Sequence, residues 1–264
     1  MKKPVNTFRH QQNRNMLRWL LIFCVVIVVG SALLLVTLPE NRERLFGALR
    51  RGEGLQKKSP SEPLPSEAGL NGAAVVNTDI TVRPISAEDH LLGEIAAPVQ
   101  LIVYGDFQCP FCARFFDTLE QARKEYGRKL VIAFRNYPLA NHDLAMPAAN
   151  AVECAAAQGK FETAYYSLFE ANKAATLSQD LLNGLGKTLG LDEGVYLGCL
   201  TKAEYTDKIA AEKAEVKKLG VIGTPASFIN GQYLPGAVPY EDFTYPDGSK
   251  GEGLKTLIEK KLIK

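Results

Sequence analysis

The chain has 264 residues, 46% of them hydrophobic, and a formal net charge of +2. This length suits one large domain or two small ones. The small net charge, without basic and aromatic residues interleaved along the sequence, argues against a nucleic acid partner.

Residues 19–38 form a run of 20 without a charged side chain. About 20 apolar residues are needed for a helix to cross a bilayer, and this run is longer than the apolar core of a typical signal peptide. A weak cleavage site, Gly30-Ser31-Ala32, is followed directly by three leucines. We therefore predict a single uncleaved transmembrane helix at 19–38, embedded in the lipid bilayer. The alternative is a cleaved signal sequence.

The first 18 residues contain basic but no acidic side chains, which favours a cytoplasmic tail over residues 1–18. The opposite flank is also basic, so charge alone does not decide the orientation. A disulfide persists only outside the cytosol, and a long C-terminal domain can translocate whatever its charge. We therefore predict a single-pass protein of the cell membrane whose residues 39–264 lie on the extracytoplasmic face. Cys24, within the span, is expected to be inert.

Residues 39–79 separate the predicted span from the rest of the chain. Residues 52–78 are rich in Gly, Ser, Pro and Glu and show neither a helical nor a strand period. This composition is typical of a flexible tether. We predict a juxtamembrane segment and linker over 39–79, followed by one folded domain over 80–264.

The stretch Cys109-Pro110-Phe111-Cys112 lies between an apolar strand, 101–104, and an amphipathic helix. The first turn of a helix has unpaired N–H groups and a partial positive charge, which lower the pKa of a thiol below its usual value of roughly 8.5. Pro110 suits the first helical position. Cys112 lies one turn deeper and can reach the Cys109 sulfur. The pattern therefore predicts a redox-active pair.

Two other interpretations of Cys-x-x-Cys are half of a structural zinc site and a purely structural disulfide. Zinc usually requires a second such motif or a close histidine pair. The other cysteines and the histidines are isolated in the sequence: Cys24, Cys154, Cys199, His10, His90 and His142. A short-range, strained disulfide is generally labile rather than structural. We therefore predict no metal and no cofactor.

The chain after the Cys109 helix alternates between strands and helices. The β-branched run 130–134 predicts a second, parallel strand. Residues 143–220 are rich in Ala, Leu and Lys and predict several helices, with Asp143, Ser178 and Asp192 as N-caps. Asn230-Gly231 predicts a hairpin turn after a strand that begins at Pro225, and an apolar face at 254–262 predicts a final helix.

Four ordered motifs in this sequence resemble the disulfide-bond protein A (DsbA) type of thioredoxin-fold oxidoreductase, in its membrane-anchored form. The resemblance covers about residues 85–264. The motifs are Gly105-Asp106-Phe107-Gln108-Cys109-Pro110-Phe111-Cys112, Arg135-Asn136-Tyr137-Pro138-Leu139, Ala145-Met146-Pro147-Ala148-Ala149 with Glu153-Cys154 and Gln158-Gly159-Lys160-Phe161, and Leu219-Gly220-Val221 with Gly223-Thr224-Pro225.

The resemblance implies an α/β thioredoxin fold with an inserted helical subdomain at about 143–220. It implies that Cys109 attacks and Cys112 resolves, and that Thr224 precedes a cis-Pro225 that faces their sulfurs. The residues expected to bind substrate are Pro110, Phe111, Thr224 and Pro225. An ordinary trans proline at the start of a strand is the alternative for Pro225.

Two departures from the family pattern bear on function. The dipeptide between the cysteines is Pro-Phe, without the histidine that stabilises the thiolate in the best-known members, which argues against a very oxidising potential. Residues 243–250 form an apparent insertion before the final helix.

Further candidates are Cys154, Cys199 and Asp106. The first two align with positions where family members often hold cysteine, which implies a structural disulfide; the alternative is two buried thiols. Asp106 ends the first strand and is expected either to relay the Cys112 proton or to cap the following loop. His142 is expected to mark a helix entry.

The predicted function is thiol–disulfide exchange on extracytoplasmic proteins, with Cys109 and Cys112 oxidising the thiols of a reduced, secreted substrate. The alternatives are a disulfide reductase or isomerase acting on misoxidised proteins, and a membrane-tethered holdase that binds peptides without turnover. The cysteines of an oxidase must be reoxidised, so we expect a membrane thiol oxidase as a partner.

Overall fold

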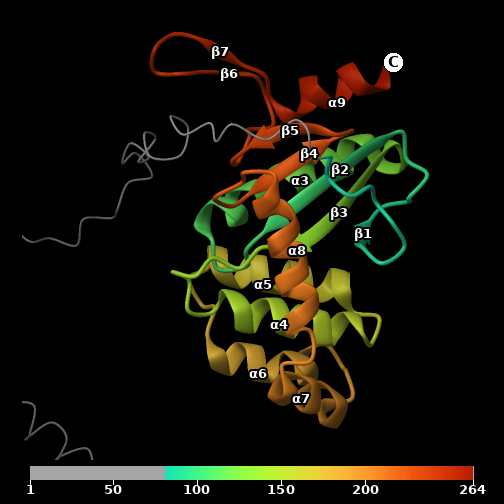
Figure 1. Cartoon of the computed structure of the whole chain (residues 1–264), viewed down its shortest axis with the longest axis vertical. Coiled ribbons are helices and arrows are strands. Elements are labelled where there is room, and N and C mark those ends of the chain that lie inside the picture. The colour runs from blue at the N-terminus through green and yellow to red at the C-terminus, as the bar shows by residue number, and fades with distance from the viewer. Residues whose placement is uncertain (1–80, 264) are drawn as a thin grey trace, which may run out of the picture. The chain divides into compact units, whose positions relative to one another are not determined.

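Residues 81–263 are described here from a computed structural model, shown in Figure 1. The predicted tail at 1–18, transmembrane helix at 19–38 with Cys24, and linker at 39–79 lie outside the described residues. Within 81–263, no helix combines the length and the apolar character that crossing a bilayer requires.

A five-stranded sheet forms the centre of the described part, in the order β1-β3-β2-β4-β5. The strands are β1 (His90–Leu92), β2 (Val99–Gly105), β3 (Leu130–Asn136), β4 (Ala226–Ile229) and β5 (Gln232–Pro235). β2 and β3 are parallel, while the other neighbours are antiparallel. Every residue of β3 is buried, as expected for a central strand covered on both faces. The predicted second, parallel strand is confirmed.

Helix α3 (Pro110–Tyr126) connects β2 to β3 and packs the side chains of Phe115, Phe116 and Leu119 into the core. It ends at Gly127, where φ is +50°, a conformation that glycine adopts without steric cost. A 3₁₀ turn, η1 (Gly127–Lys129), then leads into β3. The β2-α3-β3 unit therefore places the start of α3 at the carboxyl end of β2.

Five helices separate β3 from β4. They are α4 (Ala145–Ala156), α5 (Phe161–Lys173), α6 (Gln179–Thr188), α7 (Glu193–Lys202) and α8 (Thr206–Lys218). Figure 1 shows α4 to α7 gathered below the sheet, with α8 returning from them toward β4. The predicted α/β thioredoxin-like fold with a helical insertion is confirmed.

The predicted helix starts are right at two positions and wrong at one. Ser178 and Asp192 accept the N–H groups of Leu181 and Val195 and cap α6 and α7. Asp143 does not cap α4, which begins after Leu144. The Leu144 N–H is instead bound at 2.6 Å by the Gln108 side chain. This partner lies 36 residues earlier in the chain, so a local sequence pattern does not reveal it.

The C-terminal part contains the predicted hairpin and final helix. Asn230 and Gly231 have φ values of +44° and +83° and join β4 to β5. The inserted segment forms a small second sheet, β6 (Phe243–Thr244) and β7 (Lys250–Gly251), which protrudes from the body in Figure 1. Helix α9 (Leu254–Leu262) then buries the side chains of Leu254, Leu257 and Ile258.

Hydrophobic side chains fill both faces of the sheet. One face packs against α3, α9 and the insert, and the other carries Tyr104, Tyr137 and Phe228 against Val216 of α8. The core therefore lies between the sheet and the helices, directly beneath the start of α3.

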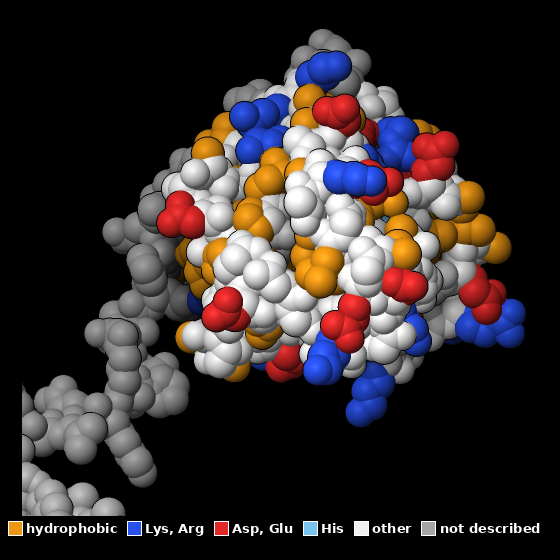
Figure 2. Space-filling view, turned by 90° about the horizontal axis from the view of Figure 1, so that it is seen from below, with side chains coloured by type: hydrophobic (Ala, Val, Ile, Leu, Met, Phe, Trp, Pro, Cys, Tyr) orange, Lys and Arg blue, Asp and Glu red, His pale blue; other side chains and the backbone are white. Residues whose placement is uncertain are grey.

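At the insert end of the molecule, Figure 2 shows acidic, basic and hydrophobic side chains interspersed over the surface.

Candidate active site

The cysteine pair lies at the first turn of α3. Cys109 is the N-cap residue, with extended backbone angles of −71° and 122°, and Pro110 occupies the first helical position. The Cys109 N–H donates to the Asp106 carbonyl at 3.1 Å, and the Cys109 carbonyl accepts the Ala113 N–H at 3.1 Å. Cys109 and Cys112 are both thiols and both buried, with 2% and 3% of their surface exposed.

The environment of Cys109 favours its thiolate. A hydrogen bond from the Cys112 thiol lowers the pKa of Cys109, and contacts with Thr224 and the N–H groups of Cys112 and Phe111 lower it further. Burial acts in the opposite direction, but the net effect is a pKa of about 6. At neutral pH most of this sulfur is therefore ionised, which makes it a nucleophile and a good leaving group.

The environment of Cys112 has the opposite effect. Burial raises its pKa well above the usual range of a thiol, and the neighbouring Cys109 sulfur raises it further. The Asp106 N–H donates to the Cys112 sulfur at 3.4 Å. One helical turn thus holds an acidic thiol and a thiol that retains its proton.

The loop between α8 and β4 approaches the pair from the other side. The Cys109 thiol donates to the Thr224 carbonyl at 3.5 Å, and the Thr224–Pro225 peptide bond is cis. The Thr224 hydroxyl is buried and has no hydrogen-bond partner among the described residues. This hydroxyl is therefore available to the charged form of the Cys109 sulfur.

Polar contacts hold α8 in place, and with it the loop that carries Thr224. The Glu212 carboxylate accepts the Asn136 backbone N–H at 2.6 Å, at the end of β3. Burial raises the pKa of Glu212. Glu215, one turn later, accepts from Arg135 at 3.3 Å and from the Arg83 N–H at 3.0 Å. These contacts attach α8 to the strand next to the one that leads into the cysteine pair.

Pro110 and Phe111 face outward between the cysteines. Pro110 is exposed, and Phe111 is 39% exposed, with the Arg114 guanidinium 4.5 Å from the centre of its ring. On the opposite loop, Ile222 is 79% exposed two residues before Thr224. The buried sulfurs are thus accompanied by apolar side chains that an incoming polypeptide can contact.

Aromatic rings form the floor beneath Cys112. Phe107, Phe134, Tyr165 and Phe169 pack with ring centres 4.8–6.2 Å apart. A cavity of only about 10 Å³ remains between Cys112 and three of these rings, those of Phe134, Tyr165 and Phe169, at the lower limit of the space that one water occupies. An apolar, closely packed floor disfavours a charge on Cys112, which agrees with the direction of its pKa.

Asp106 is buried and holds the loop that precedes Cys109. One carboxylate oxygen accepts the Gln108 N–H at 2.8 Å, and the other accepts the Leu139 N–H at 2.9 Å and lies 2.8 Å from His142 Nδ1. All of these contacts are those of a capping residue, and the carboxylate has no hydrogen bond to either cysteine among the described residues. His142 itself precedes α4 and accepts the Ala145 N–H on its carbonyl oxygen.

Several residues around the pair have no counterpart among the sequence predictions. Asn172 of α5 donates to the carbonyl groups of Phe107 and Cys109, and Tyr165, also of α5, contributes one of the rings of the floor. These residues lie in the insert, more than 50 positions from the cysteine motif. A single sequence therefore offers no signal that links them to it.

Cys154 and Cys199 form a disulfide that joins α4 to α7, with Cα atoms 5.9 Å apart. Both residues are buried inside the insert. Among residues 81–263, no group of three or more His, Cys, Asp or Glu side chains is arranged to hold a metal ion.

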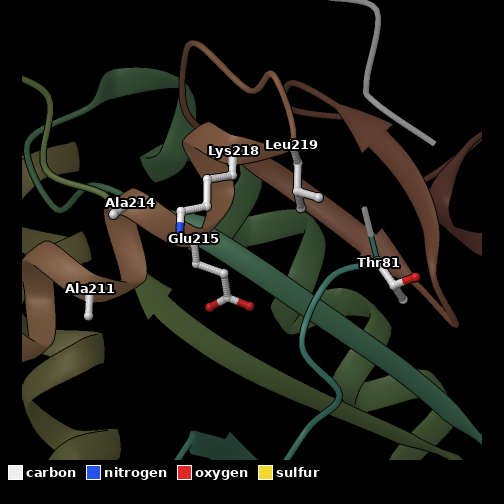
Figure 3. A pocket seen from close by; sticks show the side chains of 6 residues that line it. All are labelled: Thr81, Ala211, Ala214, Glu215, Lys218 and Leu219. Carbon is white, nitrogen blue, oxygen red and sulfur yellow. The ribbon is translucent and has the colours of Figure 1, made fainter. Parts of the chain in front are cut away.

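A larger cavity, of about 380 Å³, lies along α8, and Figure 3 shows the side chains that line it, none of which belongs to the cysteine pair. Its lining combines small and apolar side chains with Glu215 and Lys218. Glu215 is already paired with Arg135 and Arg83, and the lining holds no thiol. The redox-capable chemistry of the described residues therefore lies at α3.

Solved structures similar to this chain include the oxidised form of BdbD from Bacillus subtilis, with a TM-score of 0.57 and 21% identity over 70% of this chain and 98% of that one. The thiol-disulfide exchange protein alpha-DsbA2 from Wolbachia pipientis has a TM-score of 0.54 and 18% identity over 67% and 88% of the two chains. At this level of identity, the likeness establishes the fold.

Curated relatives include the Na(+)/H(+) antiporters NhaA 1 of Mycobacterium sp. (strain KMS), 34% identical over 57% of this chain, and NhaA 1 of Salinispora arenicola, 30% identical over 68%. The chain spans about a quarter of the length of these relatives, so their names describe much longer proteins. A sequence model of the family described as thioredoxin matches residues 86–245, which is more than half of the chain. The chain belongs to the thioredoxin family.

Proposed function

We propose that this chain catalyses thiol–disulfide exchange on protein substrates through Cys109 and Cys112, mainly by oxidising substrate thiols. The observation that carries the proposal is that the pKa values of two neighbouring thiols are shifted in opposite directions. The pKa of Cys109 is lowered to about 6, and the pKa of Cys112 is raised. Such a pair has one sulfur suited to attack and departure, and one that remains protonated after it is released.

The reaction begins with the Cys109–Cys112 disulfide. A substrate thiolate attacks the Cys109 sulfur, the bond between the two cysteines breaks, and the Cys112 sulfur leaves and takes up a proton. A second substrate thiolate then attacks the substrate sulfur of the mixed disulfide and releases Cys109 as a thiolate. The substrate gains one disulfide and loses two electrons, which the enzyme retains as two reduced cysteines.

Pro110, Phe111, Thr224 and Pro225 form the proposed substrate-binding face. The Phe111 ring is exposed two residues after Cys109, and the Thr224 carbonyl oxygen lies 3.5 Å from the Cys109 sulfur. A polypeptide that binds over both groups has its cysteine next to Cys109 while neighbouring side chains contact apolar surface. Such contacts need no defined sequence, which suits unfolded substrates.

The direction of exchange depends on how strongly the reduced form is stabilised. A reactive cysteine with a pKa of about 7 accompanies a potential of about −270 mV in thioredoxin, and one of about 3.5 accompanies about −120 mV in DsbA. The pKa of Cys109, about 6, lies between these values. We therefore expect an intermediate potential, consistent with oxidation in a compartment outside the cytosol and with the missing histidine between the cysteines.

We further propose that residues 19–38 anchor the chain in the cell membrane, with the catalytic domain on the extracytoplasmic face. The uncharged run of 20 residues and the tether-like composition of 52–78 support this arrangement. The proposed substrates are reduced secreted proteins. Tethering would raise the effective concentration of the domain near a membrane thiol oxidase that regenerates the disulfide.

The test uses the oxidised protein and a fluorescent peptide with two reduced cysteines. We expect the peptide to be oxidised stoichiometrically, and Cys109→Ala to abolish the reaction. The potential is measured by equilibration with glutathione. A potential near −270 mV would favour a reductase instead. Peptide binding that survives in Cys109→Ala, without any oxidation by the wild type, would favour a holdase.

A further inference from the structure

Asn172 connects the helical insert to the backbone of the reactive cysteine. It is the next-to-last residue of α5, and its side-chain amide donates to the Phe107 carbonyl at 2.8 Å and to the Cys109 carbonyl at 3.1 Å. Both partners are carbonyl oxygens, so the nitrogen of the amide must face them. One side chain thus bridges two carbonyl groups on either side of Gln108.

The bridged segment decides where the Cys109 sulfur lies. Cys109 is the N-cap residue of α3, and its carbonyl accepts the first backbone hydrogen bond of that helix from Ala113. The N–H groups of Phe111 and Cys112 lower the pKa of Cys109 only while its sulfur remains over them. A rotation of the backbone at Phe107 or Cys109 would move the sulfur away from these donors.

Local interactions leave this segment incompletely fixed. Cys109, as N-cap, has no side-chain capping bond to α3. Asp106 and Gln108 are held through their own side chains, by contacts with the segment 139–144. The Phe107 carbonyl, between these two residues, and the Cys109 carbonyl, directly after them, both accept from the side-chain amide of Asn172.

We propose that Asn172 is a positioning residue that keeps the Cys109 sulfur aligned with the N-terminal N–H groups of α3, and thereby sets the acidity of the nucleophile. The inference rests on the proposed exchange function and adds a residue of the insert to its machinery. The insert would thus tune the reactivity of the cysteine pair as well as cover it.

The test measures the rate of Cys109 alkylation by iodoacetamide against pH, in the reduced protein. Asn172→Ala should move the midpoint upward by up to about one unit, because one unit corresponds to about 1.36 kcal/mol, the scale of one hydrogen bond. Asn172→Asp, which has the same shape but lacks the donor and adds a negative charge, should move it further. Because aspartate has the same shape as asparagine, Asn172→Asp provides the test if Asn172→Ala does not fold.

Asn183→Ala is the matched control, since Asn183 is exposed on α6 and, among the described residues, forms a side-chain hydrogen bond only with Gln179. It should leave the midpoint at the wild-type value. Thermal unfolding of the oxidised forms shows whether a variant changes the stability of the fold as well as the pKa of Cys109. Wild-type midpoints in both Asn172 variants would overturn the inference. Alkylation needs no substrate, so a wild type with the expected midpoint that fails to oxidise peptides would refute only the proposed function.

Discussion

The thiol of Cys109 lies 3.5 Å from the carbonyl oxygen of Thr224, a residue 115 positions later in the chain. The neutral thiol donates to this oxygen, whereas the thiolate needs a donor in return. The buried Thr224 hydroxyl, which has no other hydrogen-bond partner among the described residues, is in place to provide one.

Thr224→Val preserves the branched shape of the side chain and removes this donor. We expect the pKa of Cys109 to rise by about one unit, since a hydrogen bond to a charged group contributes about 1.5–3 kcal/mol, partly replaced by other donors. The measurement is thiolate absorbance against pH. Thr188→Val serves as the control, because Thr188 is exposed on α6 and its hydroxyl, among residues 81–263, bonds only to the Gly184 carbonyl. An unchanged pKa in Thr224→Val would exclude the hydroxyl as a donor.

The stability of the reduced protein should depend on the ionisation of Cys109. Its pKa is about 6 in the folded state and roughly 8.5 in an unfolded chain. The ionisation of Cys109 therefore contributes its full stabilisation of the folded state above about pH 8.5. This contribution decreases as the pH falls and is lost below about pH 6. Compared with reduced Cys109→Ser, the wild type should gain up to about 3 kcal/mol between pH 5 and pH 9 in urea unfolding. A constant difference between the two proteins would contradict the lowered pKa.

The reduction potential should also show this ionisation. Below about pH 6, reduction of the disulfide takes up two protons, and the potential should fall by about 59 mV per pH unit. Above it, Cys109 remains ionised, one proton is taken up, and the slope should be about 30 mV per unit. Equilibration with glutathione at several pH values measures the slope. A change of slope near pH 8 instead of pH 6 would mean that the pKa of Cys109 is not lowered.

Replacing Cys112 should have two separable effects. Without the resolving thiol, a Cys109 thiolate that attacks a peptide disulfide releases one peptide thiol, and the resulting mixed disulfide should accumulate, as mass spectrometry would detect. The hydrogen bond from Cys112 is also the largest influence that lowers the pKa of Cys109. Cys112→Ala should therefore raise this pKa more than Cys112→Ser, which keeps a hydroxyl donor. Equal pKa values in the two variants would show that this hydrogen bond has no effect.

Asp106→Asn distinguishes the two predicted roles of Asp106. An amide has a single acceptor oxygen, so it cannot accept from Gln108, Leu139 and His142 together. If the residue organises the loop, the variant should lose about 1–3 kcal/mol of stability in urea unfolding. The control is Asp143→Asn, at an exposed residue next to His142, which should leave the free energy of unfolding unchanged. If Asp106 relays the Cys112 proton instead, resolution of a mixed disulfide should slow while stability is retained.

The disulfide between Cys154 and Cys199 closes a loop of 45 residues within the insert. In the chain-entropy model, the double variant Cys154→Ala/Cys199→Ala should be less stable by about 4 kcal/mol. Because this bond lies outside the Cys109 environment, the pKa of Cys109 should stay at about 6 in the folded variant. Unfolding in urea and alkylation against pH provide the two measurements, and a coupled change in both would reveal a link between insert and site.

Much of the fold could be predicted from local patterns in the sequence. The apolar run before Cys109, the proline after it and the spacing of two residues between the cysteines place the pair at a strand-to-helix junction. Asn230-Gly231 specifies its turn, since both residues tolerate positive φ. The prediction of Asp143 as an N-cap was wrong because a side chain from another part of the chain, Gln108, binds the start of α4.

The sequence alone therefore determined where an acidic thiol belongs, because helix ends, turns and strand periods depend on residues that are close along the chain. Only the tertiary structure decided which groups surround that thiol. The contacts of Cys109 with Thr224 and Asn172 join residues 115 and 63 positions apart. Such contacts form when helices and sheet pack to bury apolar surface, a driving force without direction that leaves no short-range pattern in the sequence.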